Sequence, residues 1–412
     1  MRLTFQSKSA EASGPAIPGK FSAGRLAGIA LLAVSFFAAQ PARAHHEQGK
    51  LRVAAILSLS GPNAYLGRAE LRALELGVAE LNAGGGVEGH VLELAAFDDQ
   101  GEPVKAADFA ARLTGDAHAD VIIGGTSTDA SIAIARLAEK LRTPFISLGA
   151  GSQILTFSRR WVFKTPPSER IVLNRILEDM ARRGIRRMAL LAEETEFGRG
   201  GLREIRDATN RQSVAFRKFG VALAFDATFR ADGSGIANFV ERVPRDAALG
   251  AVVVFGTGEG PAAVLKELRR AGAKTPVYLT HGVASAEFLA VAGEAAEGAR
   301  APSPPLLVAD ALPETDPRRK TVMAFASAYR ARFNESPSSF AGYAWDALMM
   351  VAAAVRRSPL TDQDWIRAPL EITRVHAGVT GSYTIWPDDH LGLDEKALLM
   401  LEVRRGAWRI AE

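Results

Sequence analysis

The feature that most constrains the fold is a regular alternation of short apolar stretches with amphipathic ones, which restarts once along the chain. Strand–helix alternation at this spacing predicts parallel sheets with right-handed crossovers. One series precedes Pro166-Pro167 and the other follows it, so we expect two doubly wound α/β lobes. The expected strands are 51–57, 91–97, 120–123, 144–147, 187–192, 251–255 and 276–279, and the expected helices are 70–81, one from about 103, 132–140, 200–211 and 261–271.

Two of these helices carry clear end signals. Three consecutive glycines follow helix 70–81, and glycine readily adopts the left-handed backbone conformation that closes a helix. Pro103 suits the first position of a helix, where the missing N–H would have no helical partner. These residue types therefore support the predicted end of helix 70–81 and the predicted start of the helix at about 103.

The first 44 residues have the pattern of a secretory signal. Basic residues dominate positions 1–25, an apolar run covers 26–39, and Ala42-Arg43-Ala44 provides a cleavage motif. The apolar run is shorter than the about 20 residues that a spanning helix needs, which disfavours a membrane anchor. We expect cleavage after Ala44 and export to the periplasm.

Removal of this leader changes how the charge is interpreted. The chain has 50 basic and 46 acidic residues, and five basic and one acidic residue lie within positions 1–44, so the remainder has 45 of each. The high isoelectric point therefore belongs to the leader and gives no indication of nucleic-acid binding. The chain has no cysteine, which excludes disulfides, thiol catalysis, cysteine-ligated metals and a lipid anchor on an N-terminal cysteine.

Five motifs in order carry a resemblance to a known family. They are residues 58–67 (SLSGPNAYLG), 80–89 (ELNAGGGVEG), 97–103 (FDDQGEP), 121–128 (VIIGGTST) and 143–147 (TPFIS). In this order and spacing they resemble the leucine/isoleucine/valine-binding family of ABC-transporter receptors. The resemblance covers about residues 50–400, is strongest in 51–152 and 193–198, and weakens after 300.

The resemblance implies a type I periplasmic-binding fold, in which three crossing strands join two lobes and the ligand sits in the cleft. We expect lobe 1 at 48–163 with 298–375, and lobe 2 at 164–297 with 376–412. It also implies a periplasmic substrate-binding protein that captures a branched-chain amino acid or related small carboxylate and delivers it to permease subunits in the inner membrane. Ligands of open α/β sheets bind beyond the carboxyl ends of strands, which agrees with a cleft site.

In lobe 1 the resemblance implies that hydroxyls and backbone N–H groups hold the carboxylate of the ligand. Thr128 falls at the hydroxyl position, before a helix, where it provides either an anion site or ordinary capping. The loop Gly149-Ala150-Gly151-Ser152 matches the second contact, but Gly151 stands where the family usually has threonine, and only the adjacent Ser152 offers a hydroxyl. Tyr65 is expected near the cleft mouth, one position before the family's aromatic residue.

In lobe 2, Phe197 matches an aromatic residue that closes over the ligand, and Gly258 and Glu259 occupy the next loop. His281 stands where the family's amino-acid binders place the carboxylate that pairs with the ammonium. A histidine can donate hydrogen bonds and carry a positive charge near neutral pH, but it cannot supply a negative one. Either Glu259 supplies that charge, or the ligand lacks an ammonium, or His281 is a loop residue away from the ligand.

No enzyme, metal or cofactor signature is present. The sequence has no nucleophile elbow, H-E-x-x-H motif or phosphate loop, and its seven histidines form no ligand cluster. We therefore expect a monomeric binding protein with no catalytic residues, cofactor, metal or nucleic-acid partner. The alternatives are a receptor for an aromatic or short organic acid without an amine, and a ligand-sensing subunit of a signalling system.

Overall fold

The computed structural model describes residues 49–113, 118–155, 159–358 and 364–412. The predicted signal peptide and its cleavage site after Ala44 lie outside these ranges. Within them, no helix combines the length and the apolar character that crossing a membrane requires.

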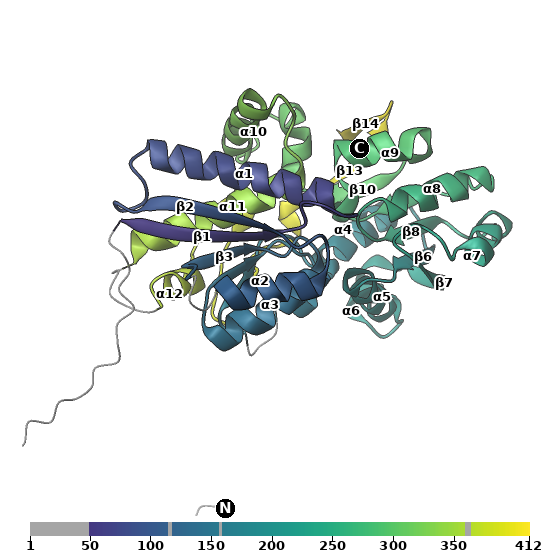
Figure 1. The fold of residues 1–412 in the computed structure, drawn as a ribbon. Coiled ribbons are helices and arrows are strands. Elements are labelled where there is room, and N and C mark those ends of the chain that lie inside the picture. Colours follow the sequence, from purple (N-terminus) through teal and green to yellow (C-terminus); the bar gives the residue numbers. More distant parts are fainter. Residues whose placement is uncertain (1–48, 114–117, 156–158, 359–363) are drawn as a thin grey trace, which may run out of the picture. The chain divides into compact units, whose positions relative to one another are not determined.

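The first sheet has five parallel strands in the order β2-β1-β3-β4-β5, of which β2, β1 and β3 are labelled in Figure 1. This order reverses direction between β1 and β3, which makes that point a switch point where crevices form in doubly wound sheets. The strands are β1 (Lys50–Leu57), β2 (Val91–Asp98), β3 (Val121–Gly124), β4 (Phe145–Ser147) and β5 (Val162–Lys164), and the intervening helices are α1 (Ala64–Ala83), α2 (Pro103–Leu113), α3 (Thr128–Leu141) and η1 (Ser152–Ile154).

The second sheet repeats this arrangement. Its parallel strands follow the order β7-β6-β8-β9-β10, and an antiparallel pair, β13 and β14, extends the sheet beyond β10. The strands are β6 (Arg187–Glu193), β7 (Ala222–Phe229), β8 (Ala251–Phe255), β9 (Val277–Leu279), β10 (Arg300–Ser303), β13 (Leu399–Arg404) and β14 (Ala407–Ile410). The helices are α4 (Glu169–Arg182), α5 (Glu196–Thr209), α6 (Val214–Phe219), α7 (Ala237–Arg242), η2 (Val243–Arg245), α8 (Gly260–Arg270), η3 (His281–Val283), α9 (Ala286–Ala292) and η4 (Gly293–Ala296).

Both sheets are covered on both faces, which explains their continuously apolar strands. In β1, Val53 and Ala55 share an apolar cluster with helices α1 and α11 (Ser339–Arg357), whereas Ala54 shares another with α2 and α3. In β6, Leu190 joins the cluster of α4 and α5, and Leu191 joins that of α7, α8 and α9. Figure 1 shows helices on either side of each sheet.

The chain passes between the two sheets at three places: after β5, after β10 and before β13. Between the last two it forms helices that pack beside α1. The elements of this stretch are η5 (Pro305–Ala311), α10 (Arg319–Phe333), α11, α12 (Arg367–Glu371), β11 (His376–Ala377), β12 (Ser382–Tyr383) and η6 (Glu395–Ala397).

Buried hydrogen bonds tie the crossing segments together. Thr165, after β5, donates from its hydroxyl to the carbonyl of Tyr343 in α11 (3.0 Å), and its own carbonyl accepts from the Tyr383 hydroxyl (3.1 Å). Asp346 of α11 accepts from the backbone N–H groups of Val379 (2.8 Å) and Thr380 (2.9 Å). We call these six residues the crossing network.

The predicted elements are confirmed, with shifts at their ends. Helix α1 begins at Ala64, six residues before the expected start, and it closes as predicted: Gly85 has a positive φ of 92°, and the Gly86 N–H donates to the Leu81 carbonyl (2.9 Å). Pro103 is the first residue of α2, as expected. The elements that were not predicted include strands β5, β7, β10, β13 and β14 and helices α4, α6, α7, α9, α10, α11 and α12.

A buried carboxyl group lies under the loops that follow β1 and β3. Glu70 of α1 is fully buried, and its Oε2 accepts from the Thr126 hydroxyl (2.6 Å), which in turn accepts from the Ser58 N–H (3.1 Å). Burial raises the pKa of Glu70 to about 8, although the Thr126 bond opposes the shift. The carboxyl group is therefore largely protonated at neutral pH.

Glu70→Gln should make the protein more stable at pH 8 and leave its stability at pH 5 nearly unchanged. The folded pKa lies above the unfolded one, so wild-type stability falls as pH rises between about 4.5 and 8, and glutamine removes this loss. We expect a gain of up to about 4 kcal/mol at pH 8, measured by urea unfolding at both pH values. A variant that is less stable at pH 8 would contradict a protonated Glu70.

Candidate functional site

A cavity of about 720 Å³ lies between the two sheets, at the carboxyl ends of their strands. Loops after β1 and β3 form one wall, and loops after β6, β8 and β9 form the other. Both switch points therefore face this cavity, which is where ligands bind in doubly wound sheets. Its size suits a small organic molecule.

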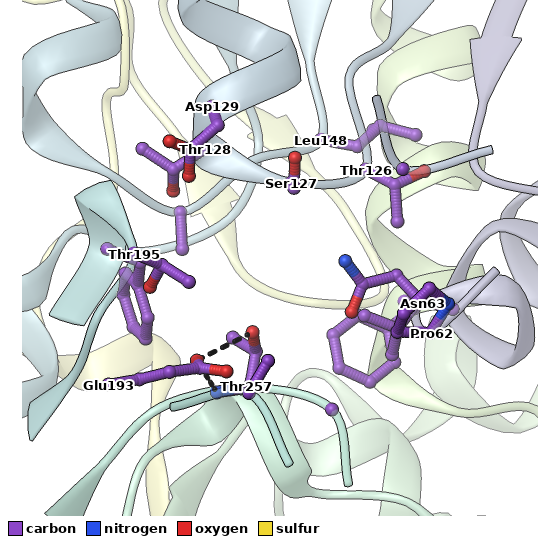
Figure 2. A pocket seen from close by; sticks show the side chains of 18 of the residues that line it. Pro62, Asn63, Thr126, Ser127, Thr128, Asp129, Leu148, Glu193, Thr195 and Thr257 are labelled. Carbon is purple, nitrogen blue, oxygen red and sulfur yellow. Dashed lines mark hydrogen bonds between the residues drawn. The ribbon is translucent and has the colours of Figure 1, made fainter. Parts of the chain in front are cut away.

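One wall contains the N-terminus of α3. Ser127 is the N-cap, and its side chain accepts from the Ala130 N–H (3.1 Å). Thr128 is therefore not the cap, and its hydroxyl oxygen instead accepts from the Gly151 N–H (3.0 Å). The Thr128 O–H remains available to donate to a ligand, beside the partial positive charge of the helix N-terminus. Figure 2 shows residues 126–129 along one side of the cavity.

The glycine at position 151 has a specific steric cause. A Cβ atom there would lie 2.3 Å from Cγ2 and 3.0 Å from Oγ1 of Thr128. Thr128 thus occupies the space that a threonine at position 151 would need. The φ of Gly151 is −60°, so space rather than backbone conformation requires glycine here.

Hydrogen bonds from buried residues fix the rest of the loop at residues 149–152. Lys164 of β5 is fully buried, and its ammonium donates to the carbonyls of Ala150 and Gly151. The Ser152 N–H donates to Oε2 of Glu169 (2.7 Å), and the Gly149 N–H donates to the Ser147 hydroxyl (3.1 Å). Of this loop, Ala150 lines the cavity.

Aromatic side chains form another part of the wall. Phe197 of α5 is buried and lies edge to face with His281, with ring centroids 5.8 Å apart. His281 lies edge to face with Tyr343 at 6.4 Å, and Tyr343 contacts Phe340 in the same way at 6.3 Å. All four residues line the cavity. They give it an apolar surface against which a ligand side chain can pack.

His281 is uncharged in this environment. It is 1% exposed, and burial, together with the nearby Lys164, lowers its pKa to about 3. The positively charged form considered from the sequence is therefore wrong for this state of the protein. A neutral imidazole offers a ligand hydrogen bonding but no charge.

A carboxyl group that the sequence analysis did not select lies opposite α3. Glu193 is the last residue of β6 and is 3% exposed. Its Oε2 accepts from the N–H (3.0 Å) and the hydroxyl (3.4 Å) of Thr257, the bonds drawn in Figure 2. Burial raises the pKa of Glu193 to about 7, and Asp129 across the cavity adds to the shift.

The charged side chains that line the described part of the cavity are all acidic, and a buried cation near it, Lys164, lies behind the Ala150–Gly151 loop. Five acidic residues line it, and among the residues that the structure describes, its lining contains no lysine or arginine. The acidic residues are Asp129, Glu193, Glu194, Asp232 and Glu259.

Comparison with known proteins agrees with this architecture. A family model described as periplasmic binding protein matches residues 50–406. The chain belongs to this family. It is a periplasmic binding protein of the leucine/isoleucine/valine-binding type. Such proteins bind substrates and are not enzymes, which confirms the expected absence of catalysis.

Relatives of this binding protein are distant but cover most of the chain. The Leu/Ile/Val/Thr-binding protein of Salmonella typhimurium is 24% identical over 355 residues, covering 84% of this chain and 87% of the relative. An extracellular ligand-binding receptor from Rhodopseudomonas palustris HaA2 has a TM-score of 0.79 at 26% identity, covering 88% of this chain and 100% of the receptor. The protein LivJ from Streptococcus pneumoniae, in complex with isoleucine, has a TM-score of 0.76 at 22% identity, covering 88% and 99%. The expected type I periplasmic-binding fold is confirmed.

The structure brings together some of the predicted site residues of this binding protein. Thr128, Ala150, Phe197, Gly258, Glu259 and His281 line the cavity. Tyr65, Gly149, Gly151 and Ser152 do not, although Leu66, next to Tyr65, does. Tyr65 lies beside the cavity instead, with its ring 6.4 Å from that of Phe340.

Gly258 and Glu259 lie where the lobe-2 wall approaches the loop after β1. Gly258 has a positive φ of 69°, and a Cβ atom there would lie 3.3 Å from Oδ1 of Asn63. Glu259 is exposed and is the N-cap residue of α8, but its side chain makes no capping hydrogen bond. Its carboxylate is therefore solvated at the cavity rim, unlike that of Glu193.

Several lining residues were missed by the sequence analysis: Asn63, Glu193, Thr195, Thr257, Phe340 and Tyr343. Glu193 carried a usable signal, because it is the one acid within the apolar strand β6 and stands at its carboxyl end. Phe340 and Tyr343 carried none, since α11 reaches the cavity only through the tertiary fold.

Proposed function

We propose that this protein is the substrate-binding protein of an ABC transporter and that it captures an α-amino acid in the cavity between its sheets. The observation that carries the proposal is the distribution of charge around the cavity. Helix N-terminal N–H groups and the Thr128 hydroxyl on one wall suit a carboxylate. The described lining of the cavity contains carboxylates but no lysine or arginine to pair with them, and such a lining suits an ammonium.

A carboxylate without an amine fits this cavity less well. Such a ligand would bring a further negative charge among five acidic residues, while His281 is neutral. The dipole of α3, neutral donors and the Lys164 ammonium behind the Ala150–Gly151 loop would oppose that repulsion. The amino acid is therefore the better supported of the two ligand classes considered from the sequence.

Hinge closure is the proposed mechanism. A ligand that touches both walls favours the closed form by its extra contacts there, and the transporter would bind that form. The walls already meet beside the cavity: the Glu196 N–H donates to Oδ2 of Asp129 (3.3 Å), and the Gln153 amide donates to the Glu196 carbonyl (3.4 Å). Export to the periplasm, cleavage after Ala44, a division into two lobes, a monomeric state and permease partners belong to the same proposal.

A thermal-shift screen tests the ligand class. Protein purified from the periplasm of an expressing bacterium is heated with each common L-amino acid, and the leucine, isoleucine, valine and phenylalanine samples are paired with their 2-keto acids, which lack the amine. A ligand at 100 times its Kd should stabilise the protein by about 2.7 kcal/mol. We expect at least one amino acid to raise Tm and the 2-keto acids to have no effect. Binding of a 2-keto acid alone would establish the organic-acid alternative.

A further inference from the structure

The family resemblance leaves the ammonium of the ligand without its usual partner, because His281 stands at that position and carries no charge. The candidate partners are therefore the acidic residues of the cavity itself. They differ in how each carboxyl group is held and in how far it is removed from water. These two properties decide how strongly a carboxylate attracts a cation.

Glu193 is distinguished from Glu259 by burial. Glu259 is exposed, so water screens its charge, whereas Glu193 is 3% exposed at the end of β6. An ion pair in such a site is stronger than one at the surface, provided that hydrogen bonds fix the carboxylate. Thr257, in the loop after β8, fixes the Glu193 carboxylate, because its N–H and its hydroxyl both donate to Oε2. Oε1 is the oxygen left to contact a ligand.

We infer that Glu193 binds the ammonium of the ligand, in place of the acid that the family carries at the position of His281, and that amino-acid binding releases a proton from Glu193. This inference rests on the proposed function. The ammonium would lie between Glu193 and the α3 N-terminus, which Figure 2 shows on opposite sides of the cavity. The ligand carboxylate would then face α3.

Proton release follows from the surroundings of Glu193. The titratable groups around the cavity are Asp129 of α3, Glu194, Asp232, Glu259, Tyr65 and the neutral His281, and the buried Lys164 lies behind the Ala150–Gly151 loop. The described lining itself contains no lysine or arginine that would stabilise the Glu193 carboxylate. Its pKa is accordingly raised to about 7. An ammonium favours the ionised form, so the ligand must displace any proton present. Affinity should therefore fall as pH drops below about 7, by at most tenfold per pH unit.

Isothermal titration of Glu193→Gln with the common L-amino acids tests the assignment. We expect an affinity loss of about 100-fold for amino acids that bind the wild-type protein, because one partner of a buried charge pair is removed. Glu314→Gln is the control, since it removes an exposed carboxylate that does not line the cavity, and we expect a change of about threefold or less. Equal affinity of wild type and Glu193→Gln would overturn the inference and leave the proposed function standing.

Proton release is measured on the wild-type protein and does not depend on how a variant folds. Titrations at pH 6.5 in two buffers of different ionisation enthalpy give the number of protons released, which we expect to be about one half or more. No release would overturn the inference even if amino acids bind. If no L-amino acid binds the wild type in either experiment, the proposed function fails, and the assignment of Glu193 fails with it.

Discussion

Asp346→Ala should destabilise the protein by about 3–5 kcal/mol, because it removes the centre of the crossing network. Asp346 is fully buried on α11. Alanine would leave the N–H groups of Val379 and Thr380 and the hydroxyl of Thr380 without their acceptor. Each buried donor without an acceptor costs about 1–3 kcal/mol. Urea unfolding followed by circular dichroism measures the loss.

Asp310→Ala is the control for this prediction. Asp310 forms an exposed ion pair with Arg330, and such pairs contribute about 0–1 kcal/mol. An Asp346→Ala variant that is no less stable than Asp310→Ala would show that the segment around residue 380 is held by other contacts. A large loss would place a main determinant of stability in the connection between the lobes.

Gly151→Thr should weaken amino-acid binding by tenfold or more, on the order of 1.4 kcal/mol, although it restores the residue usual in the family. The new side chain would collide with Thr128, whose hydroxyl we assign to the ligand carboxylate. Thr128→Ala should also weaken binding, because it removes that hydroxyl. The double variant, with Gly151→Thr and Thr128→Ala together, should lose less affinity than the two single losses added together. Alanine at position 128 removes the collision, and the threonine at position 151 supplies a hydroxyl.

The coupling between the two positions is the quantity to measure. Residues in contact show interaction energies of about 0.5–3 kcal/mol, and independent residues show none. Titration calorimetry on the wild type, both single variants and the double variant gives the four affinities of a double-mutant cycle. Ser152→Thr, one position away, serves as the control. Strictly additive losses would mean that the two side chains do not share one site.

The architecture was predictable from the sequence because the signals that define it are local. Apolar runs of strand length, the glycines after α1 and Pro103 each act through their own backbone, and the structure has these features where they were expected. Strand β7 was missed because its side chains are half-buried and mixed in polarity. Helix α4 was missed because charged residues interrupt its apolar positions.

The site was less predictable because its residues meet only through the fold. Motif matching selected loop positions, and Thr128 and His281 do line the cavity. It could not show that Thr128 fills the space beside Gly151, because no sequence pattern reports a distance between side chains 23 positions apart. The environment of Glu193 is likewise a product of burial and of Thr257, which lies 64 positions away.

The repeated strand order of the two sheets means that the cavity is nearly symmetric in its backbone. The loop from β3 into α3 has a counterpart from β8 into α8, and the loop from β1 into α1 has one from β6 into α5. Helix N-termini therefore face the cavity from both halves, and the backbone alone gives a bound zwitterion no preferred direction. The few side chains that differ between the halves, such as Thr128 and Glu193, would set its polarity. Exchanging acids and hydroxyls between equivalent loops is thus a route by which this scaffold could bind a ligand in the opposite orientation without changing its fold.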